Sequence, residues 1–566
     1  MTQFKDIPYT RPDFNAFKEN FTSLMDDFKN ASSWQVQDEI MQKINDARND
    51  IDTDFSIVSV RNSIDTTDPF YETEQEFMDN LSPLYSELVT EYYKVLAASP
   101  YRTDLENKWG KQLFRLAEMS AKCISPEVIE DLQHENTLST EYQKLLASAK
   151  IMFDGEERNL AAMAPYMQHT DRSVRQEASK AKWAFFTENS EQLDRIYDDL
   201  VRLRTSIAHK LGFKNYVDLG YMRMARSDYN EAMVAGYREK IHRNIVPITQ
   251  RLRERQKNRL GLDKLTFVDE GLYFNSGNPT PKGDPDWIVA RAKEMYADMS
   301  PETNEFFSFL CDNGLMDLVN RPTKSGGGYC TMFPKYKAPF IFSNFNGTSH
   351  DVDVLTHEAG HAFQCYMSRN NGIAEYYFPT MEACEIHSMS MEFFAWKWIK
   401  SFFKEDEDKY QFEHLSGALL FLPYGVTVDE FQHFVYNNPT ATPTERKQAW
   451  RGIEKKYLPH RDYAGEPFLE AGGLWQQQKH IYQSPFYYID YTLAQVCALQ
   501  FWVRTKTDRD GAWKDYLELC KAGGKYSFTE LVKLANLHSP FEEQSFENII
   551  GDINHRLDGV PDSHFA

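Results

Sequence analysis

The sequence predicts a mainly α-helical fold with one small β-sheet. Apolar residues recur at helical spacing from Phe14 to about Glu270, with few internal prolines. The only convincing strand pattern runs from about Tyr329 to Gly347, and helical periodicity resumes at Asp351. With 566 residues, of which 42% are hydrophobic and 14% aromatic, the chain has enough material for a large core in two or more lobes.

The first half of the chain is expected to be entirely helical. Long helical stretches cover Glu74 to Leu96 and Asp171 to Leu211. Residues Asn275 to Trp287 are dense in Asn, Gly, Pro and Asp, which is typical of a loop or hinge. A second break at Pro322 to Tyr329 precedes the predicted sheet.

Helices are expected to fill the chain after the sheet. Breaks are predicted near Pro439 to Pro443, Pro459 to Pro467 and Ser484-Pro485. The most apolar stretch, Leu415 to Val426, contains Pro423 and is too short to span a bilayer.

The segment Thr356-His357-Glu358-Ala359-Gly360-His361 carries the strongest chemical signal. Residues four apart lie on one face of a helix, so His357 and His361 can both direct an imidazole nitrogen at one ion. Glu358 lies beside that face, where a general base can reach a water on the metal. The pattern H-E-x-x-H indicates half of a zinc hydrolase site.

The sequence around this motif supports its placement on a helix. A strand pattern from Phe340 to Thr348 precedes it, and Ser349 to Asp351 supply helix-start chemistry. Apolar residues then continue at helical spacing until Asn370-Asn371-Gly372, a strong stop signal.

A catalytic zinc needs a third protein ligand, and candidates lie on the next predicted helix, from Pro379 to about Phe403. Its stripe of Glu382, Glu385, Met389 and Glu392 carries carboxylates on an otherwise apolar helix, which need a partner such as a divalent cation. Spacing alone leaves Glu382 and Glu385 as alternatives. His387 faces away from Glu385 and is expected to be packed or exposed. The metzincin pattern is excluded, because Gln364 and Met367 stand where it requires Gly and His.

Composition limits the partners and the compartment. A formal net charge of −21 argues against general affinity for nucleic acid or for an anionic membrane surface. Residues Met1 to Lys18 show no apolar core of a secretory signal, so a cytoplasmic protein is expected. The 7 cysteines are scattered without a C-x-x-C pair and are expected to be reduced and mostly buried. No motif indicates an oligomeric state.

With Glu385 to Glu392 some 24 residues after His361, the motif resembles the zinc signature of the thimet oligopeptidase and oligoendopeptidase F family. The chain is most similar to the bacterial oligoendopeptidase F branch. The resemblance includes Arg202 to Met224, Phe342 to Gly347 and His480 to Tyr491. We therefore divide the chain into an N-terminal helical region, residues 1–170, which matches only in helical character, and a catalytic zinc peptidase region, residues 171–566, with intertwined lobes.

The resemblance implies roles for several residues. Glu385 becomes the third ligand of one Zn²⁺ per chain, with His357 and His361, and Glu382 becomes a candidate for supporting the site without binding the ion. His480 and Tyr491 are expected to bind the developing oxyanion, with Tyr482 as the earlier tyrosine of the same segment. Tyr487 and Tyr488 are expected to pack in the core.

The expected reaction is hydrolysis of internal bonds in short peptides, with a zinc-bound water as nucleophile and Glu358 as general base. The strand carrying Phe342, Asn344 and Gly347 is expected to pair with the substrate backbone. The resemblance also implies two helical lobes around a deep central channel that excludes folded proteins.

Two other functions remain as alternatives. A metallo-exopeptidase of the carboxypeptidase kind needs a group that holds a free substrate terminus, and neither a Gly-x-Met-Glu-Asn nor a His-Glu-Ser-Gln segment is present. A non-catalytic helical peptide-binding protein is disfavoured by the intact set of His357, Glu358, His361 and Glu385.

Overall fold

The computed structural model describes residues 3–565, which form a mainly α-helical protein with small sheets, as predicted. The first helices are α1 (Phe14–Lys29), α2 (Trp34–Ile64), α3 (Pro69–Ala97), α4 (Arg102–Trp109), α5 (Lys111–Ser120), α6 (Ile129–Ala147) and α7 (Ala164–Met167). The next are α8 (Arg172–Glu188), α9 (Ser190–Lys210), α10 (Tyr216–Arg223), α11 (Glu231–Asn244), α12 (Val246–Arg259), α13 (Pro285–Met299) and α14 (Pro301–Asp312).

Helices also fill the chain after the sheet. They are α15 (His350–Ser368), α16 (Met381–Phe394), α17 (Lys400–Phe403), α18 (Glu407–Asn437), α19 (Pro443–Tyr457), α20 (Pro467–Glu470), α21 (Lys479–Gln483), α22 (Tyr488–Thr505), α23 (Arg509–Ala522), α24 (Phe528–Leu534) and α25 (Gln544–Asp558). The predicted break near Pro439 separates α18 from α19, and the break near Pro459 separates α19 from α20. The break at Ser484 separates α21 from α22.

Local chemistry explains where several helices begin. Asp68 caps α3 by accepting hydrogen bonds from the amides of Phe70 and Tyr71, and Pro69 occupies the first helical position. Asp284 ends the predicted loop in the same way by capping α13. The predicted helix from Asp171 to Leu211 is broken at Asn189, which ends α8, and α9 starts at the next residue.

The main sheet has the strand order β3-β5-β4, formed by β3 (Met316–Val319), β4 (Tyr329–Phe333) and β5 (Ala338–Phe345). β3 is parallel to β5, and β4 is antiparallel to it, so Phe342 is paired on both sides. At Phe342 the expected pairing of this strand with substrate is therefore corrected, because both sides of β5 are already paired there. The register with β4 ends at Phe342, so for Asn344 and Gly347 the pairing stays a prediction. An edge strand beside β5 is β4.

A second sheet was not predicted. It is the hairpin of β1 (Ile151–Phe153) and β2 (Glu156–Arg158), with Asp154 and Gly155 at the turn. Strands of three residues are too short for a periodicity signal, and the same holds for β3 with four.

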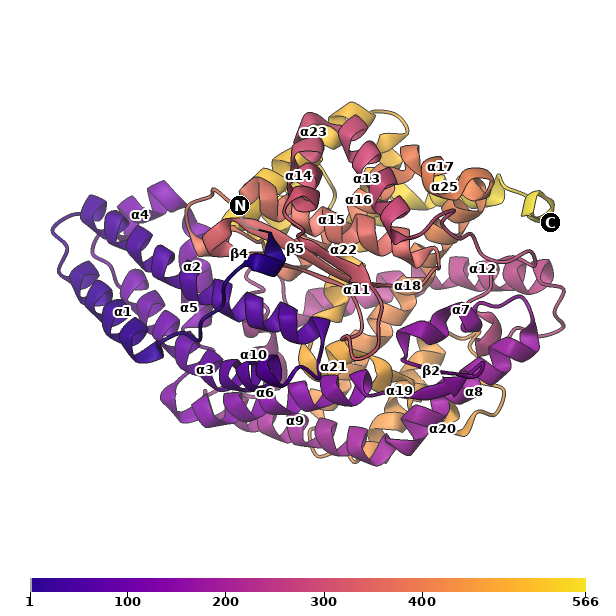
Figure 1. Cartoon of the computed structure of the whole chain (residues 1–566), viewed down its shortest axis with the longest axis horizontal. Helices are drawn as coiled ribbons and strands as arrows, with labels where there is room; N and C mark the ends of the chain where they lie inside the picture. Colours follow the sequence, from indigo (N-terminus) through magenta and orange to yellow (C-terminus); the bar gives the residue numbers. More distant parts are fainter. Residues whose placement is uncertain (1–2, 566) are drawn as a thin grey trace.

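The core joins distant parts of the chain. One large hydrophobic cluster extends from Phe4 to Phe565. Near the middle of the molecule, α16 packs against both α15 and α22 (Figure 1). A smaller cluster lies among α1 to α5 and takes in Ile373 and Tyr376, which follow α15. The predicted boundary near residue 170 falls between α7 and α8 and stays a prediction.

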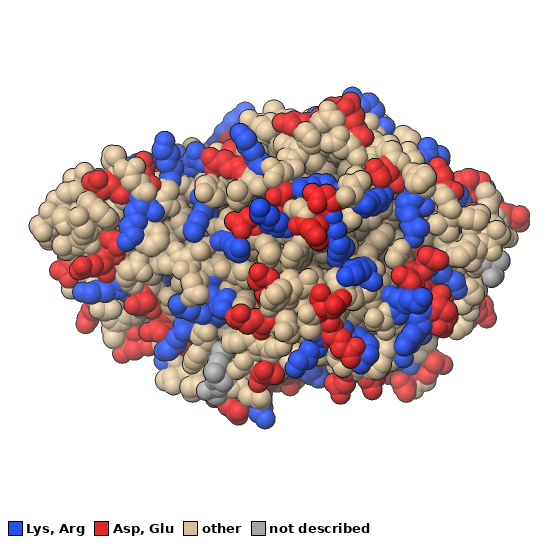
Figure 2. Space-filling model, turned by 90° about the horizontal axis from the view of Figure 1, so that it is seen from above, with Lys and Arg blue, Asp and Glu red and all other residues tan. Residues whose placement is uncertain are grey.

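The surface carries both signs of charge. On the face shown in Figure 2, acidic and basic side chains are interspersed. Within residues 3–565, no helix combines the length and the apolarity needed to cross a bilayer.

Candidate metal centre and active site

Helices α15 and α16 meet at a glycine inside the motif. A Cβ built on Gly360 lies 2.6 Å from the carbonyl oxygen of His387 and 2.6 Å from the Cα of Ser388. Because both contacts are to backbone, no side chain can move aside to make room. Gly360 thus allows the close approach that brings the next helix to His357 and His361.

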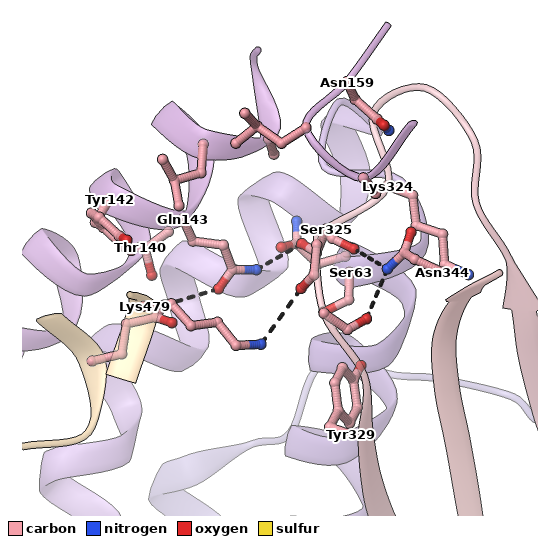
Figure 3. Close-up of a pocket in the computed structure, with 18 of the residues that line it drawn as sticks. Ser63, Thr140, Tyr142, Gln143, Asn159, Lys324, Ser325, Tyr329, Asn344 and Lys479 are labelled. Atoms are coloured by element: carbon pink, nitrogen blue, oxygen red, sulfur yellow. Dashed lines mark hydrogen bonds between the residues drawn. The ribbon is translucent and has the colours of Figure 1, made fainter. Parts of the chain in front are cut away.

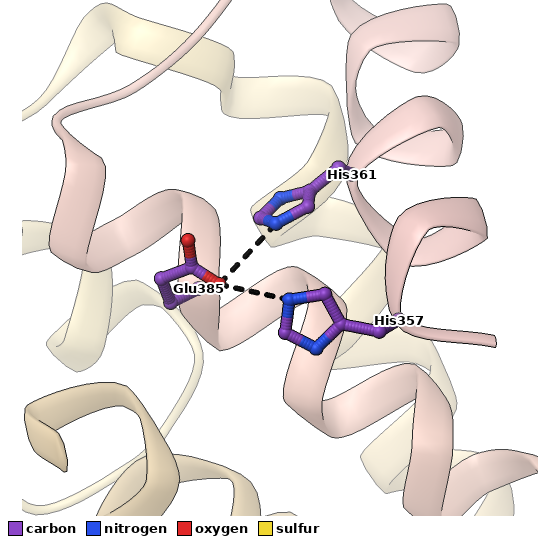
Figure 4. A group of neighbouring side chains, drawn as sticks. All are labelled: His357, His361 and Glu385. Carbon is purple, nitrogen blue, oxygen red and sulfur yellow. Dashed lines mark ion pairs between the residues drawn. The ribbon is translucent and has the colours of Figure 1, made fainter. Parts of the chain in front are cut away.

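Three side chains converge where the two helices meet (Figure 4). Nε2 of His357 and Nε2 of His361 each lie 3.2 Å from Oε2 of Glu385. The candidate ligand atoms all lie within 4.8 Å of one another, and Glu385 is 1% exposed. Two imidazole nitrogens and one carboxylate oxygen form the donor set of a catalytic zinc site, so these residues fit a Zn²⁺ ion.

A hydrogen-bonded chain orients His357. Oε1 of Glu392 lies 2.7 Å from Nδ1 of His357, and its Oε2 lies 2.7 Å from Nε2 of His414. The indole N–H of Trp396 donates to Nδ1 of His414 at 3.1 Å, so the proton of a neutral His414 is on Nε2 and points at Glu392. This arrangement leaves Nε2 of His357 free to bind a metal. The sequence stripe included Glu392, but nothing in the sequence indicated His414.

Glu358 is buried beside the three candidate ligands. One carboxylate oxygen, Oε2, has no hydrogen-bond partner among the described residues. Burial raises the pKa of Glu358 above its ordinary value. A Cβ on Gly328 would lie 3.1 Å from Oε1, so the absence of a side chain at Gly328 leaves room for this carboxylate.

The segment before and at the start of α22 brings His480 to Tyr491, at 3.1 Å from Nε2 to the hydroxyl oxygen. The amide of Gln478 donates to Nδ1 of His480 at 2.7 Å, and the hydroxyl of Tyr424 donates to the oxygen of the same amide. His480 therefore keeps its proton on Nε2. Burial lowers the pKa of His480 to about 3, so the ring is neutral near pH 7. Burial also raises the pKa of Tyr491, which keeps its hydroxyl proton.

Tyr482 does not reach this site. Its ring is fully buried and stacks on Tyr142 with centroids 3.9 Å apart, and its hydroxyl donates to the carbonyl of Leu193. The expected oxyanion role of Tyr482 is corrected, because its side chain points into the core.

Tyr487 and Tyr488 do reach the site, contrary to the expectation of core packing. The hydroxyl of Tyr487 donates to Oε1 of Glu385, and Tyr488 lines the cavity in front of Glu358. The intervening turn has an unusual backbone, since Phe486 has φ 67°. Its amide donates to Gln432 at 2.7 Å, which helps to hold this left-handed conformation.

The two remaining candidates on α16 are not ligands in this arrangement. Glu382 is buried, and its pKa is raised to about 8 by burial and by nearby Asp490. His387 is fully buried, and neither ring nitrogen has a hydrogen-bond partner among the described residues. Of the two placements predicted for His387, packed or exposed, the structure shows the packed one.

Two cavities meet at Gln478 and His480, which line both. We call the first, of about 620 Å³, the acidic cavity; its ionisable residues include Glu270, Asp353, Glu358, Glu392 and Glu413, with His350, His357, His414 and His480. We call the second, of about 610 Å³, the amide cavity; its polar lining includes Asn62, Gln75, Gln143, Asn159, Asn320, Asn344, Gln477, Gln478 and Gln483, with Lys324 and Lys479. Of the three residues expected on the substrate strand, Asn344 lines the amide cavity, Phe342 is fully buried, and Gly347 lies at neither cavity.

Comparisons with known proteins place the chain among peptidases. The family model described as Peptidase M3 N-terminal domain matches residues 4–124, and the model described as Peptidase family M3 matches residues 302–549. The first match corrects the expectation that the N-terminal residues resemble the family only in helical character.

Individual relatives agree with the family models. A solved structure of Pz peptidase A with an inhibitor is 56% identical, with a TM-score of 0.98 over 99% of this chain and 100% of that one. An oligoendopeptidase F homolog of Borreliella burgdorferi is 21% identical over 72% of this chain and 70% of that protein. Oligoendopeptidase F of Enterococcus faecium, at 14% identity and a TM-score of 0.63 over 97% of this chain and 98% of that one, shares the fold.

Proposed function

Because the chain belongs to peptidase family M3 and is a peptidase, we propose that it is a zinc-dependent endopeptidase that cleaves internal bonds of short peptides. The observation that carries the proposal is the convergence of His357, His361 and Glu385 beside Glu358. A carboxylate with a free oxygen next to a three-donor metal site is suited to metal-assisted hydrolysis of an amide.

His357, His361 and Glu385 would hold the ion. When bound, Zn²⁺ supplies Lewis acidity, which polarises the scissile carbonyl and makes a water molecule more acidic. Glu385 is suited to bind a cation: burial alone raises the pKa of a carboxyl group, but the two imidazoles hold the pKa of Glu385 well below its usual range.

Glu358 is the proposed general base. Its burial raises the affinity of the carboxylate for a proton, and none of the residues that the structure describes donates a hydrogen bond to Oε2. In the proposed cycle, Glu358 takes a proton from the attacking water and returns it to the leaving amine.

Tyr491 is the proposed donor to the developing oxyanion. A hydroxyl whose pKa is raised by burial remains protonated through the working pH range, so it can donate throughout the reaction. The chain from Tyr424 through Gln478 and His480 directs the Nε2 proton of His480 toward Tyr491. His480 therefore supports the hydroxyl as a neutral donor.

The proposed substrate is a short peptide in extended form. The edge strand β4 lines the amide cavity with Tyr329, Cys330 and Thr331, so it is our candidate for backbone pairing in place of Phe342 on β5. Backbone pairing gives affinity that depends little on the side chains of the substrate.

The test uses an internally quenched peptide blocked at both ends and the Glu358→Ala variant. We expect the wild type to cut the blocked peptide internally in a zinc-dependent way, and Glu358→Ala to keep one zinc per chain but lose about 10²-fold or more in kcat. His357→Ala should lose both zinc and activity.

The same assay decides between this function and the alternatives. A metallo-exopeptidase would leave the doubly blocked peptide intact and cut only an unblocked one. A non-catalytic peptide-binding protein would bind both peptides and cut neither. A fully active Glu358→Ala enzyme would contradict the role given to Glu358.

A further inference from the structure

The two cavities that meet at His480 differ in charge. Among the described residues lining the acidic cavity there are five carboxylates and neither Lys nor Arg. The described lining of the amide cavity contains two lysines and neither Asp nor Glu. The amide cavity thus departs from the composition of the whole chain, in which 84 acidic residues outnumber 63 basic ones.

Only one of the two lysines is available to a ligand. Nζ of Lys324 lies 2.6 Å from Oδ1 of Asp317 and also donates to the carbonyl of Val319, and its side chain is 0% exposed. Nζ of Lys479 makes one long contact, 3.5 Å to the carbonyl of Gly326. No ion pair to a carboxylate is found for Lys479 within the part of the chain that the structure describes.

The glycine loop opposite α21 makes room for this ammonium group. A Cβ on Gly327 would lie 2.5 Å from Nζ of Lys479, and Gly327 has φ +91°. Asn344 holds the loop by donating to the carbonyls of Ser325 and Gly327, each at 2.8 Å. Figure 3 shows Lys479 reaching across the cavity toward this loop, with Asn344 on the far side.

A partly buried ammonium group without a counter-ion is unfavourable. Burial lowers the pKa of Lys479, and the field of Glu358 only partly opposes this effect. An anionic ligand in the cavity would supply the missing counter-ion, while amide and hydroxyl groups of the lining can donate further hydrogen bonds.

We propose that the amide cavity is a subsite for a carboxylate of the bound peptide, with Lys479 as the counter-ion. The proposal rests on the proposed function, since it assigns a substrate preference to the same site. The carboxylate comes either from the C-terminus of the peptide or from an Asp or Glu side chain. The described lining of the acidic cavity beyond His480 offers neither Lys nor Arg to such a group, so Lys479 favours the amide cavity as its location.

The experiment compares matched quenched peptides that differ by one carboxylate. One pair has a free or an amidated C-terminus, and a second set is amidated and carries Glu or Gln at each position in turn. We expect the wild type to favour at least one carboxylate peptide over its neutral counterpart by about 10- to 100-fold in kcat/KM, mostly through KM. In Lys479→Met the ratio should fall close to one, and Lys479→Arg should retain most of it. A preference in the first pair identifies the C-terminal carboxylate as the ligand, and a preference in the second set identifies a side-chain carboxylate.

Lys506→Met is the matched control. Lys506 is paired with Asp552, and it is not among the described residues that line either cavity. The Lys506→Met variant should keep the wild-type ratio. An equal loss by Lys479→Met on every peptide would mean that Lys479 acts on Glu358 or on the fold, and the subsite would be rejected. A wild type without any carboxylate preference would reject it as well.

Binding separates this proposal from the proposed function. Fluorescence anisotropy with the Glu358→Gln variant gives the Kd of each labelled peptide without cleavage. If the wild type cuts no peptide but the Kd values show the preference that depends on Lys479, the subsite stands and the endopeptidase assignment fails. If peptides are cut and the Kd values show no such preference, only the subsite fails.

Discussion

His357 and Glu392 form a 2.7 Å contact through Nδ1 of the imidazole, on the side of the ring away from the candidate metal site. The contact fixes the ring orientation and places the proton on Nδ1. It also links α15 to His414 on α18, so three helices cooperate in presenting one nitrogen.

Glu392→Gln should weaken zinc binding by about 10- to 100-fold, because the neutral amide holds His357 less well and reduces its basicity. Competition with a chromophoric chelator measures the zinc Kd. Glu518→Gln, a surface residue paired with Lys521, is the control and should leave the Kd unchanged. An unaltered Kd in Glu392→Gln would remove this carboxylate from the support of the metal site.

Tyr491→Phe should lower kcat by about 10²- to 10³-fold with little change in KM, because the lost hydroxyl would interact mainly with the transition state. Steady-state kinetics on the blocked peptide give both constants. Tyr482→Phe is the matched control, since its hydroxyl contacts the carbonyl of Leu193 in the core. If kcat is unchanged in Tyr491→Phe, Tyr491 does not bind the oxyanion.

Gly360→Ala should destabilise the protein and lower its zinc occupancy, although alanine is the better helix former by about 1 kcal/mol. The added Cβ meets the backbone of α16 at 2.6 Å and forces the two ligand helices apart. Thermal unfolding and metal analysis of the same samples test both effects.

Gly236→Ala in α11 is the control for the glycine effect, since a Cβ there has no atom within 4 Å. It should stabilise the protein by roughly 0.5–1 kcal/mol. If Gly360→Ala behaves like Gly236→Ala, the close packing of α15 on α16 is not essential to the site.

Glu135 should make stability depend on pH in the acid range. Burial raises the pKa of this carboxyl group, but Arg223 and Arg204 lower it to about 2 in the folded protein, against about 4.5 when unfolded. Its contribution, roughly 3 kcal/mol, is therefore fully present above pH 4.5 and is lost as the pH falls toward 2.

Thermal unfolding of Glu135→Gln between pH 3 and pH 7 checks this. The variant should be less stable than the wild type at pH 7, and the difference should shrink as the pH falls. A difference that is constant with pH would show that the carboxylate charge does not contribute.

Much of the candidate metal centre could be predicted from the sequence, because its parts are local. His357, Glu358 and His361 lie within one helical turn and a half, and the start and end of α15 are marked by ordinary helix signals. The choice of Glu385 over Glu382 came from family resemblance, since both lie on the same stripe of α16.

The tyrosines could not be predicted in the same way. Helical spacing says nothing about Phe486, whose left-handed backbone lies just before α22 and precedes Tyr487 and Tyr488. Tyr482 is separated from them by the turn and packs on Tyr142 instead. The central position of β5 in the sheet could not be predicted either, because alternation of apolar and polar residues does not distinguish a central strand from an edge strand.

The walls of the amide cavity come partly from the first third of the chain, with Asn62 on α2 and Gln143 on α6, whereas the metal ligands lie on α15 and α16. Part of the proposed substrate subsite is thus contributed by a stretch of sequence far from the candidate metal ligands. Substitutions in the early helices can change which peptides are accepted while the metal geometry stays intact. The substrate preference of such an enzyme can change in evolution while its catalytic residues stay the same.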